Sequence, residues 1–219
     1  MVREMAHEIT LLVAKLHRLG WVHRDIKPDN ILVTRKGRLI LSDMGVAGLE
    51  SSMFDGYCGT VGFTAPEVVN KRVNKTKQGI DMWALGATIL WLAGSEMDKK
   101  KKYTAQDLDT LVEEAFPRET QSDAFDFVRK CLRHKASARL SAEQAILHPW
   151  IANLPKEVPE EGPSTSSIGV LQNLTCVTGP WLDEVVDIPN NCSIKHEDKR
   201  YLLELGIGPA RELVFCSED

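Results

Sequence analysis

The feature that most constrains the fold is the stretch from Val22 to Leu32, VHRDIKPDNIL, which places an acid, a base and an amide between two structured segments. Upstream, apolar residues recur at steps of four and three and predict a helix that ends near Gly20. The residues of this stripe are Met5, Ile9, Leu12, Leu16 and Leu19. Downstream, two short apolar runs, 31–33 and 39–41, predict a β-hairpin. A loop held in this way can aim several polar side chains at one point.

The polar groups of this loop suit the transfer of a phosphoryl group. Asp25 can orient and deprotonate a hydroxyl, Lys27 can neutralise a phosphoryl oxygen, and Asn30 can bind Mg²⁺. Asp43 brings a second carboxylate at the end of the hairpin, 18 residues after Asp25. Because phosphoryl transfer depends mostly on positioning and on charge stabilisation, this set of side chains is sufficient to favour that chemistry.

The remainder of the main body is predominantly helical in its sequence pattern. Helical patterns span residues 79–94, 105–116, 122–133 and 141–147. Four consecutive lysines, 99–102, stand between two of these patterns and are predicted to form a solvated loop. Together with the hairpin, these helices predict a mainly α fold of the α+β class.

Charge divides the chain into a near-neutral body and an acidic end. The net charge is −4, with 22 basic and 19 acidic side chains in residues 1–155 but 5 basic and 12 acidic ones in residues 156–219. A body so close to neutrality does not indicate nucleic-acid binding. Proline, glutamate and serine are frequent in residues 155–169, as in linkers. The expected organisation is therefore a domain over 1–154, a linker over 155–169 and an acidic extension over 170–219.

Neither a membrane segment nor a secretory signal is predicted. The longest uncharged apolar stretch, residues 82–94, is too short to span a bilayer, and residues 1–8 lack an apolar signal core. The five cysteines form no C-x-x-C pair, which favours reduced thiols over a disulfide framework or a zinc site. We therefore expect no membrane partner and a cytoplasmic location, with the nucleus as the alternative.

Five short motifs follow one another over residues 1–152. The loop matches H-R-D-x-K-x-x-N, residues 43–45 stand at D-F-G with Met44 in place of Phe, and residues 65–67 match A-P-E. Residues 81–86 and 139–150 complete the series. In this order the motifs resemble the C-terminal lobe of a eukaryotic-type serine/threonine protein kinase. The resemblance implies the helical lobe of the kinase fold, with a small hairpin that carries the catalytic and metal-binding loops.

The resemblance also implies roles for three residues that would act on the acceptor. Asp25 resembles the catalytic base, and Lys27 resembles the lysine that binds the γ-phosphate and favours Ser or Thr as acceptor. Thr60 resembles the threonine that holds Asp25 and the acceptor hydroxyl. The implied activity is therefore the transfer of phosphoryl from ATP to serine or threonine hydroxyls of a protein substrate.

Further residues are implied to bind the nucleotide or to hold the lobe together. Asn30 and Asp43 resemble the Mg²⁺ ligands, and Leu32 resembles the residue beneath the adenine ring. ATP and Mg²⁺ are thus the implied cofactors. Glu67 and Arg139 are expected to form a buried ion pair that ties the segment before A-P-E to the helices.

A kinase also needs an upper lobe, and the sequence offers no match to it. The first glycine is Gly20, so no glycine-rich phosphate loop precedes His23. We therefore expect a truncated piece of a kinase with little activity alone, whose apolar upper face is covered by the missing lobe or by a partner. The alternative is a non-catalytic, kinase-like binding or scaffold module. A small-molecule phosphotransferase fits less well, because residues 60 and 65–67 serve protein substrates in the family.

Several neighbours of the motifs have simpler predicted roles. His23 is expected to be a buried structural residue, and Asp81 a structural acceptor for the backbone of the catalytic loop. Met44 is expected to fill core space in place of Phe. Cys58 is either a redox-sensitive thiol or an ordinary small side chain.

Overall fold

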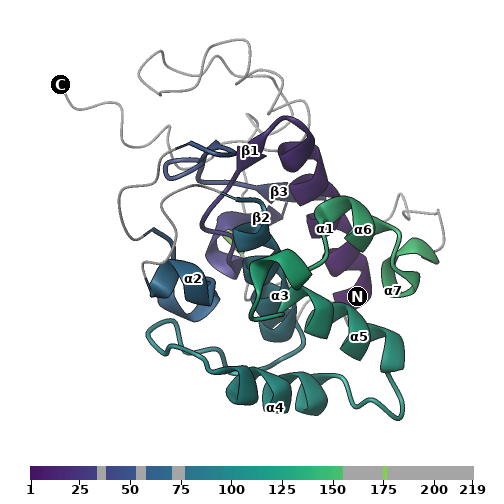
Figure 1. Ribbon diagram of the computed structural model, residues 1–219. Helices are drawn as coiled ribbons and strands as arrows, with labels where there is room; N and C mark the ends of the chain where they lie inside the picture. The colour runs from purple at the N-terminus through teal and green to yellow at the C-terminus, as the bar shows by residue number, and fades with distance from the viewer. Residues whose placement is uncertain (34–37, 53–57, 71–76, 155–174, 177–219) are drawn as a thin grey trace.

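The computed structural model describes residues 1–33, 38–52, 58–70, 77–154 and 175–176. Within these ranges the chain is mainly helical, with short strands beside the first helix (Figure 1). The helices are α1 (Val2–Arg18), α2 (Pro66–Val69), α3 (Gly79–Leu92), α4 (Ala105–Ala115), α5 (Ser122–Cys131), α6 (Ala142–Ile146) and α7 (Pro149–Ala152), with short 3₁₀ turns η1 (Pro28–Asn30), η2 (Val61–Phe63) and η3 (Ala136–Ala138). The strands are β1 (Trp21–Val22), β2 (Ile31–Val33), β3 (Leu39–Leu41), β4 (Gly48–Leu49) and β5 (Thr175–Cys176).

Helix α1 forms as its apolar spacing predicts. Met5, Ile9, Leu12 and Leu16 are buried on one side of the helix, against the rest of the core. The helix ends where Gly20 adopts a left-handed conformation with φ of +77°, and its N–H donates to the carbonyl of His17. The chain is thereby turned toward β1 and the loop that follows.

The predicted hairpin is present as the antiparallel pair β2 and β3, in which Leu32 lies opposite Ile40. Its connection, residues 34–37, lies outside the described residues. On its other edge β2 pairs in parallel with β5, with Leu32 opposite Thr175. The rest of the predicted linker and extension lies outside the described residues as well.

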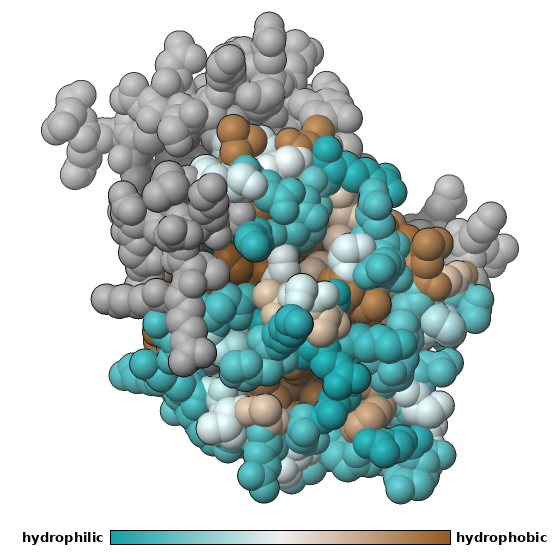
Figure 2. All heavy atoms as spheres, viewed as in Figure 1, coloured by the Kyte–Doolittle hydropathy of each residue, from teal (hydrophilic) through white to brown (hydrophobic). Residues whose placement is uncertain are grey.

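Helix α3 packs against α1, α4 and α5. Its residues are apolar on every side and nearly all buried, as expected of a helix enclosed by others. At Gly86 an added Cβ would lie 2.8 Å from Cγ of Leu132, so glycine allows α5 to approach closely. Figure 2 shows a mostly hydrophilic surface over α4 and α5, with apolar side chains set between them. Among the described residues, no helix is both long and apolar enough to cross a membrane.

Asp81, near the start of α3, fixes the backbone that leads into the catalytic-loop motif. Its side chain is fully buried and accepts hydrogen bonds from the backbone N–H groups of His23 and Arg24, each at 2.8 Å. His17 contacts the same carboxylate through Nε2 at 2.9 Å. Burial alone would raise the pKa of Asp81, but these hydrogen bonds and the nearby histidines outweigh it and hold the pKa below its ordinary value. The structural role predicted for Asp81 is confirmed.

The ion pair predicted between Glu67 and Arg139 is also present. Arg139 donates from Nη1 and Nη2 to the two carboxylate oxygens of Glu67, at 2.7 and 2.8 Å. Its remaining donors reach backbone carbonyls of Gly79, Arg133 and His134. Because the guanidinium is fully buried and uses its donors on four partners, it joins α2, α3 and the segment before α6.

Replacing Asp81 by Asn should destabilise the fold. The side-chain NH₂ of the new residue cannot accept a hydrogen bond, so it would face a backbone N–H that the carboxylate of Asp81 accepts from in wild type. We expect the free energy of unfolding to fall by about 3 kcal/mol at pH 7. Because folding lowers the pKa of Asp81, the stability that its carboxylate contributes to wild type is fully present at pH values above 3.8, the ordinary pKa of the group. This contribution is lost as the pH falls through the folded-state pKa. Urea titrations should therefore show the difference shrinking in acid, whereas the exposed Glu114→Gln control should stay near wild type throughout.

Replacing Arg139 by Met should leave the Glu67 carboxylate in a partly buried site without its partner. We expect a loss of about 3 kcal/mol in the free energy of unfolding, measured by urea titration. Arg18→Met is the matched control, because Arg18 pairs with Glu143 at the surface, where both side chains are more than half exposed. That control should change stability by less than about 1 kcal/mol. Equal effects of the two variants would contradict the role given to Arg139.

Candidate active site

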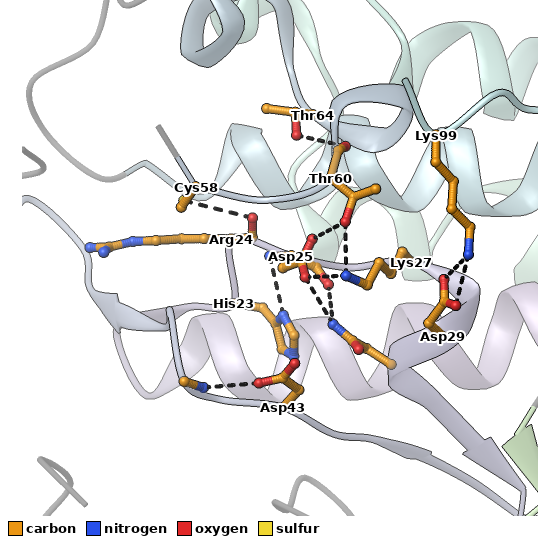
Figure 3. Close-up of polar contacts among 12 residues, drawn as sticks. His23, Arg24, Asp25, Lys27, Asp29, Asp43, Cys58, Thr60, Thr64 and Lys99 are labelled. Atoms are coloured by element: carbon orange, nitrogen blue, oxygen red, sulfur yellow. Dashed lines mark hydrogen bonds and ion pairs between the residues drawn. The ribbon is translucent and has the colours of Figure 1, made fainter. Parts of the chain in front are cut away.

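Asp25, Lys27 and Thr60 form a closed set of hydrogen bonds (Figure 3). Lys27 donates from Nζ to Oδ2 of Asp25 at 2.6 Å and to Oγ1 of Thr60 at 2.8 Å. Thr60 in turn donates to the other carboxylate oxygen of Asp25 at 3.1 Å. Thr60 comes from the segment just before η2, 35 positions after Asp25, so the tertiary fold is what brings it to the other two residues. The Asp25 carboxylate is thereby held in one orientation.

Asn30 completes this cluster from η1. Its side-chain amide donates to the backbone carbonyl of Asp25 at 2.8 Å and to Oδ2 of Asp25 at 3.2 Å. Its other side-chain atom, Oδ1, is buried and accepts no hydrogen bond from the described residues. A buried acceptor without a partner is costly unless something else binds it. This oxygen therefore fits the role of a metal ligand.

Asp43 follows β3, beside the backbone of Asn30. The backbone N–H of Ser42 donates to the carbonyl of Asn30 at 2.8 Å, and this bond closes the base of the hairpin. Asp43 itself has φ of +67°, a left-handed conformation that non-glycine residues seldom adopt and that often marks functional sites. Its carboxylate accepts from the N–H of Gly45 at 3.4 Å. The hairpin thus carries both candidate Mg²⁺ ligands at one end.

No cluster of three or more His, Cys, Asp or Glu side chains able to hold a metal occurs in the part of the chain that the structure describes. The candidate ligands are instead one amide oxygen and one carboxylate, both of them hard donors. Such a pair suits Mg²⁺, which keeps several waters and takes its other ligands from phosphates.

His23 forms hydrogen bonds with the backbone around the loop, which is the structural role predicted for it. Its ring is fully buried, with Nε2 2.9 Å from the carbonyl of Ser42 and Nδ1 accepting from the N–H of Asp25 at 3.3 Å. Burial lowers the pKa of His23, so the ring is neutral near pH 7. A neutral ring with Nε2 as donor and Nδ1 as acceptor satisfies both contacts.

Two other expectations concern buried apolar residues. Met44 is buried in the core, as predicted for a replacement of Phe. Leu32 is only 1% exposed and lies in the middle of β2, between β3 and β5. It presents almost no open surface in this conformation, and its place beneath an adenine ring stays a prediction.

Cys58 lies near the catalytic loop, with Sγ 3.9 Å from the carbonyl of Arg24. Burial raises the pKa of the Cys58 thiol to about 11. The thiolate is the reactive form, so a thiol with this pKa reacts slowly at neutral pH. Of the two alternatives for Cys58, the ordinary small side chain is therefore favoured over the redox sensor.

Asp55 was expected to stand in for a phosphate group opposite Arg24, and it lies outside the described residues. The contact that Arg24 makes with Ser52 was not predicted. Arg24 has φ of +71° and donates from Nη2 to Oγ of Ser52 at 2.8 Å. A Cβ atom at Gly48 would overlap this guanidinium, so glycine at that position makes room for the side chain. Nothing in the local sequence distinguishes Gly48 from a turn glycine, because the contact spans two loops.

Lys99 was predicted to lie in a solvated loop, but its contact with another part of the chain was not predicted. The loop of lysines 99–102 is exposed as predicted. Lys99, however, places its Nζ 2.8 Å from both carboxylate oxygens of Asp29, the neighbour of Asn30. Partial burial would raise the pKa of Asp29, but the hydrogen bond and charge of Lys99 outweigh it and lower that pKa. A pairing 70 positions apart leaves no local pattern by which to find it.

Comparison with known proteins supplies the family. Residues 1–151 match the family described as "Protein kinase domain". Similar curated proteins include the serine/threonine-protein kinase cds1 of Schizosaccharomyces pombe, 29% identical over 69% of this chain and 36% of that protein. The serine/threonine-protein kinase PEPKR2 of Arabidopsis thaliana is 31% identical, over 66% of this chain and 32% of its own length. The Aurora kinase of Patiria pectinifera is 35% identical, over 62% of this chain and 33% of its own length.

In each of these comparisons the matched region is about a third of the relative's length. The matched part of the present chain covers all five motifs, from the catalytic loop to the last motif at residues 139–150. It is more than half of the 219 residues. On this match, and with the kinase-like motifs assembled in one fold, the chain belongs to the eukaryotic-type protein kinase family.

Proposed function

We propose that this chain takes part in the transfer of the γ-phosphoryl group of ATP to serine or threonine hydroxyls of a protein. The observation that carries the proposal is the contact of Lys27 with both Asp25 and Thr60. This arrangement holds a carboxylate, an ammonium and a hydroxyl around one point, which is what an acceptor hydroxyl and a transferred phosphoryl group require. The names of the similar proteins from S. pombe and A. thaliana support serine/threonine specificity.

In this proposal Asp25 is the base that orients the acceptor hydroxyl and accepts its proton. Lys27 and Thr60 hold its two carboxylate oxygens from one side, so the carboxylate has no need to reorganise when the acceptor arrives. The Lys27 ammonium is also placed to neutralise charge on the transferred group. Because Asp25 and Lys27 are mostly buried, this charge acts in a setting with limited screening by water.

Asn30 and Asp43 are proposed to hold Mg²⁺ together with the phosphates of ATP. The free Oδ1 of Asn30 and the left-handed Asp43 support this assignment. When bound, the ion neutralises charge on the phosphate oxygens. The protein side of the site keeps Asn30 in place through its two hydrogen bonds to Asp25, which couples the metal ligand to the base.

We further propose that residues 1–154 form the C-terminal lobe of a kinase, followed by a linker and an acidic extension. Within the 219 residues no glycine-rich phosphate loop precedes His23. The nucleotide would then rest on this lobe without cover, and little activity is expected of the chain by itself. Another segment, either a covering lobe or a partner, would complete the site. The free thiols Cys58 and Cys131 support a reducing location such as the cytoplasm.

A second candidate function is a kinase-like binding module without catalysis. The parallel pairing of β5 with β2 favours it, because Thr175 lies opposite Leu32, the residue expected beneath the adenine ring. Part of the extension then stands next to the place that a nucleotide base would need. The two candidates differ in whether the chain binds ATP in a Mg²⁺-dependent way.

Nucleotide binding tests the catalytic proposal directly. The 219-residue chain should bind a fluorescent ATP analogue in the presence of Mg²⁺ and at least tenfold more weakly in its absence, as measured by anisotropy. Asp43→Asn should remove the Mg²⁺ dependence, because it removes a charged ligand. Asp25→Asn should retain it, since Asp25 is assigned to the acceptor. Binding that ignores Mg²⁺, or no binding at all, would instead favour the binding module.

Phosphoryl transfer by the chain alone should be negligible. We expect no more than background incorporation of ³²P into a generic protein substrate with Mg²⁺ and ATP, because the phosphates lack a covering loop. Asp25→Ala serves as the blank. Robust incorporation by wild type that Asp25→Ala abolishes would show that the chain is an active kinase on its own.

A further inference from the structure

Strand β2 has a neighbour on each of its two edges. On one edge it pairs with β3, the second strand of the hairpin. On the other edge it pairs in parallel with β5, so that Leu32 stands opposite Thr175 and Val33 opposite Cys176. Without β5, this edge would present backbone N–H and C=O groups that readily pair with another strand. The edge of β2 is therefore a place where an extended segment can dock, and β5 occupies it.

The side of β2 that carries Leu32 is closed in this conformation. Side chains alternate along a strand, and Ile31 and Val33 belong to the hydrophobic core. Leu32 therefore faces away from that core, yet it is only 1% exposed. A leucine that waits beneath an empty nucleotide site would be open to solvent. The surface proposed to lie under the adenine ring is thus covered while β5 is paired with β2.

A second part of the proposed nucleotide site also lies beside β5. The strand neighbours η1, whose last residue is Asn30. Asn30 is fully buried, and its Oδ1 has no hydrogen-bond partner among the described residues. A metal ligand has to be reached by the ion, so a buried oxygen of this kind belongs to a closed form of the site. The conformation with β5 in place therefore closes the site at Leu32 and at Asn30.

The sequence before β5 is long enough to let the strand bind and leave. The 20 residues from 155 to 174 separate β5 from the end of the helical lobe. Fully extended, they would span about 70 Å, whereas a lobe of this size is about 40 Å across. A tethered strand is present at its docking site at an effective concentration on the order of 1 mM. Thr175, Val177 and Thr178 are also β-branched, which favours an extended conformation.

We propose that the edge of β2 is a docking site for the segment at Thr175–Cys176 of the same chain, and that this pairing and the binding of ATP exclude each other. The inference rests on the proposed function, because it takes the adenine ring to lie over Leu32. Backbone hydrogen bonds hold the segment, as they do wherever an extended segment adds to the edge of a sheet. Nucleotide binds only to the form in which β5 has left β2.

A variant that cannot pair tests the exclusion. Thr175→Pro/Cys176→Pro removes both backbone N–H donors of β5 and should leave the edge of β2 open. With Mg²⁺ and a fluorescent ATP analogue, this full-length variant should show a Kd about fivefold lower than wild type, as expected if about a fifth of wild-type molecules are open. Ser166→Pro/Ser167→Pro adds the same two prolines in the predicted linker and should bind like wild type.

A reversible crosslink tests the pairing itself. Residues opposite each other on neighbouring strands stand about 5 Å apart, within the range that a disulfide spans. Val33→Cys should therefore form a disulfide with the native Cys176 of the same chain under mild oxidation, located by mass spectrometry. Val33→Cys/Cys176→Ser is the control that cannot form it. The oxidised single variant should bind the ATP analogue about tenfold more weakly than the same protein after reduction.

The possible results separate this inference from the proposed function. A Val33→Cys variant that forms no bond to Cys176, or forms it only between two chains, would overturn docking within the chain. Equal Mg²⁺-dependent binding by wild type, the Thr175→Pro/Cys176→Pro variant and the oxidised variant would overturn the exclusion and still support the proposed function. If no variant bound nucleotide in a Mg²⁺-dependent way, the proposed function would fail and the exclusion with it, whereas the crosslink would still decide whether β5 docks.

Discussion

The buried carboxylate of Asp81 is the contact on which the geometry of the site depends. It lies in α3, the most enclosed helix, and binds the backbone of His23 and Arg24 as the chain enters the catalytic-loop motif. A carboxylate that is fully buried is tolerated only when hydrogen bonds replace the water it has lost, and three donors do so here, counting His17. The loop is therefore held by the core itself, and its polar side chains remain available for chemistry.

A second level of organisation is the close approach of loops that are far apart in the sequence. Gly59 has φ of +90°, and a Cβ there would lie 2.8 Å from the carbonyl of Arg24. Gly48 and Gly62 permit similar approaches to Arg24 and to Asp98. Each of these glycines lies where one segment crosses another, and Gly59 lies beside Asp25 itself. Glycine is used because a side chain at these crossings would push the segments apart.

Much of the fold was predictable because its elements have local signals. The stripe from Met5 to Leu16 predicted α1, and the helical ranges predicted beyond residue 79 each overlap an observed helix. The hairpin followed from two apolar runs and a polar connection. The contact of Lys99 with Asp29 and that of Arg24 with Ser52 were not predictable, because each joins residues with no common periodicity. Such pairs are decided by how loops meet across the core.

The sequence by itself determined which chemical groups are present and in which order: an acid, a lysine and an amide in one loop, a second acid after a hairpin, and the threonine downstream. It also determined the longer helices and the hairpin, because hydrophobic periodicity acts over neighbouring residues. Only the tertiary structure decided that Thr60 meets Asp25, that Oδ1 of Asn30 remains without a partner among the described residues, and that Lys99 lies at Asp29. Those outcomes depend on burial and distance, which arise when separate segments share one core.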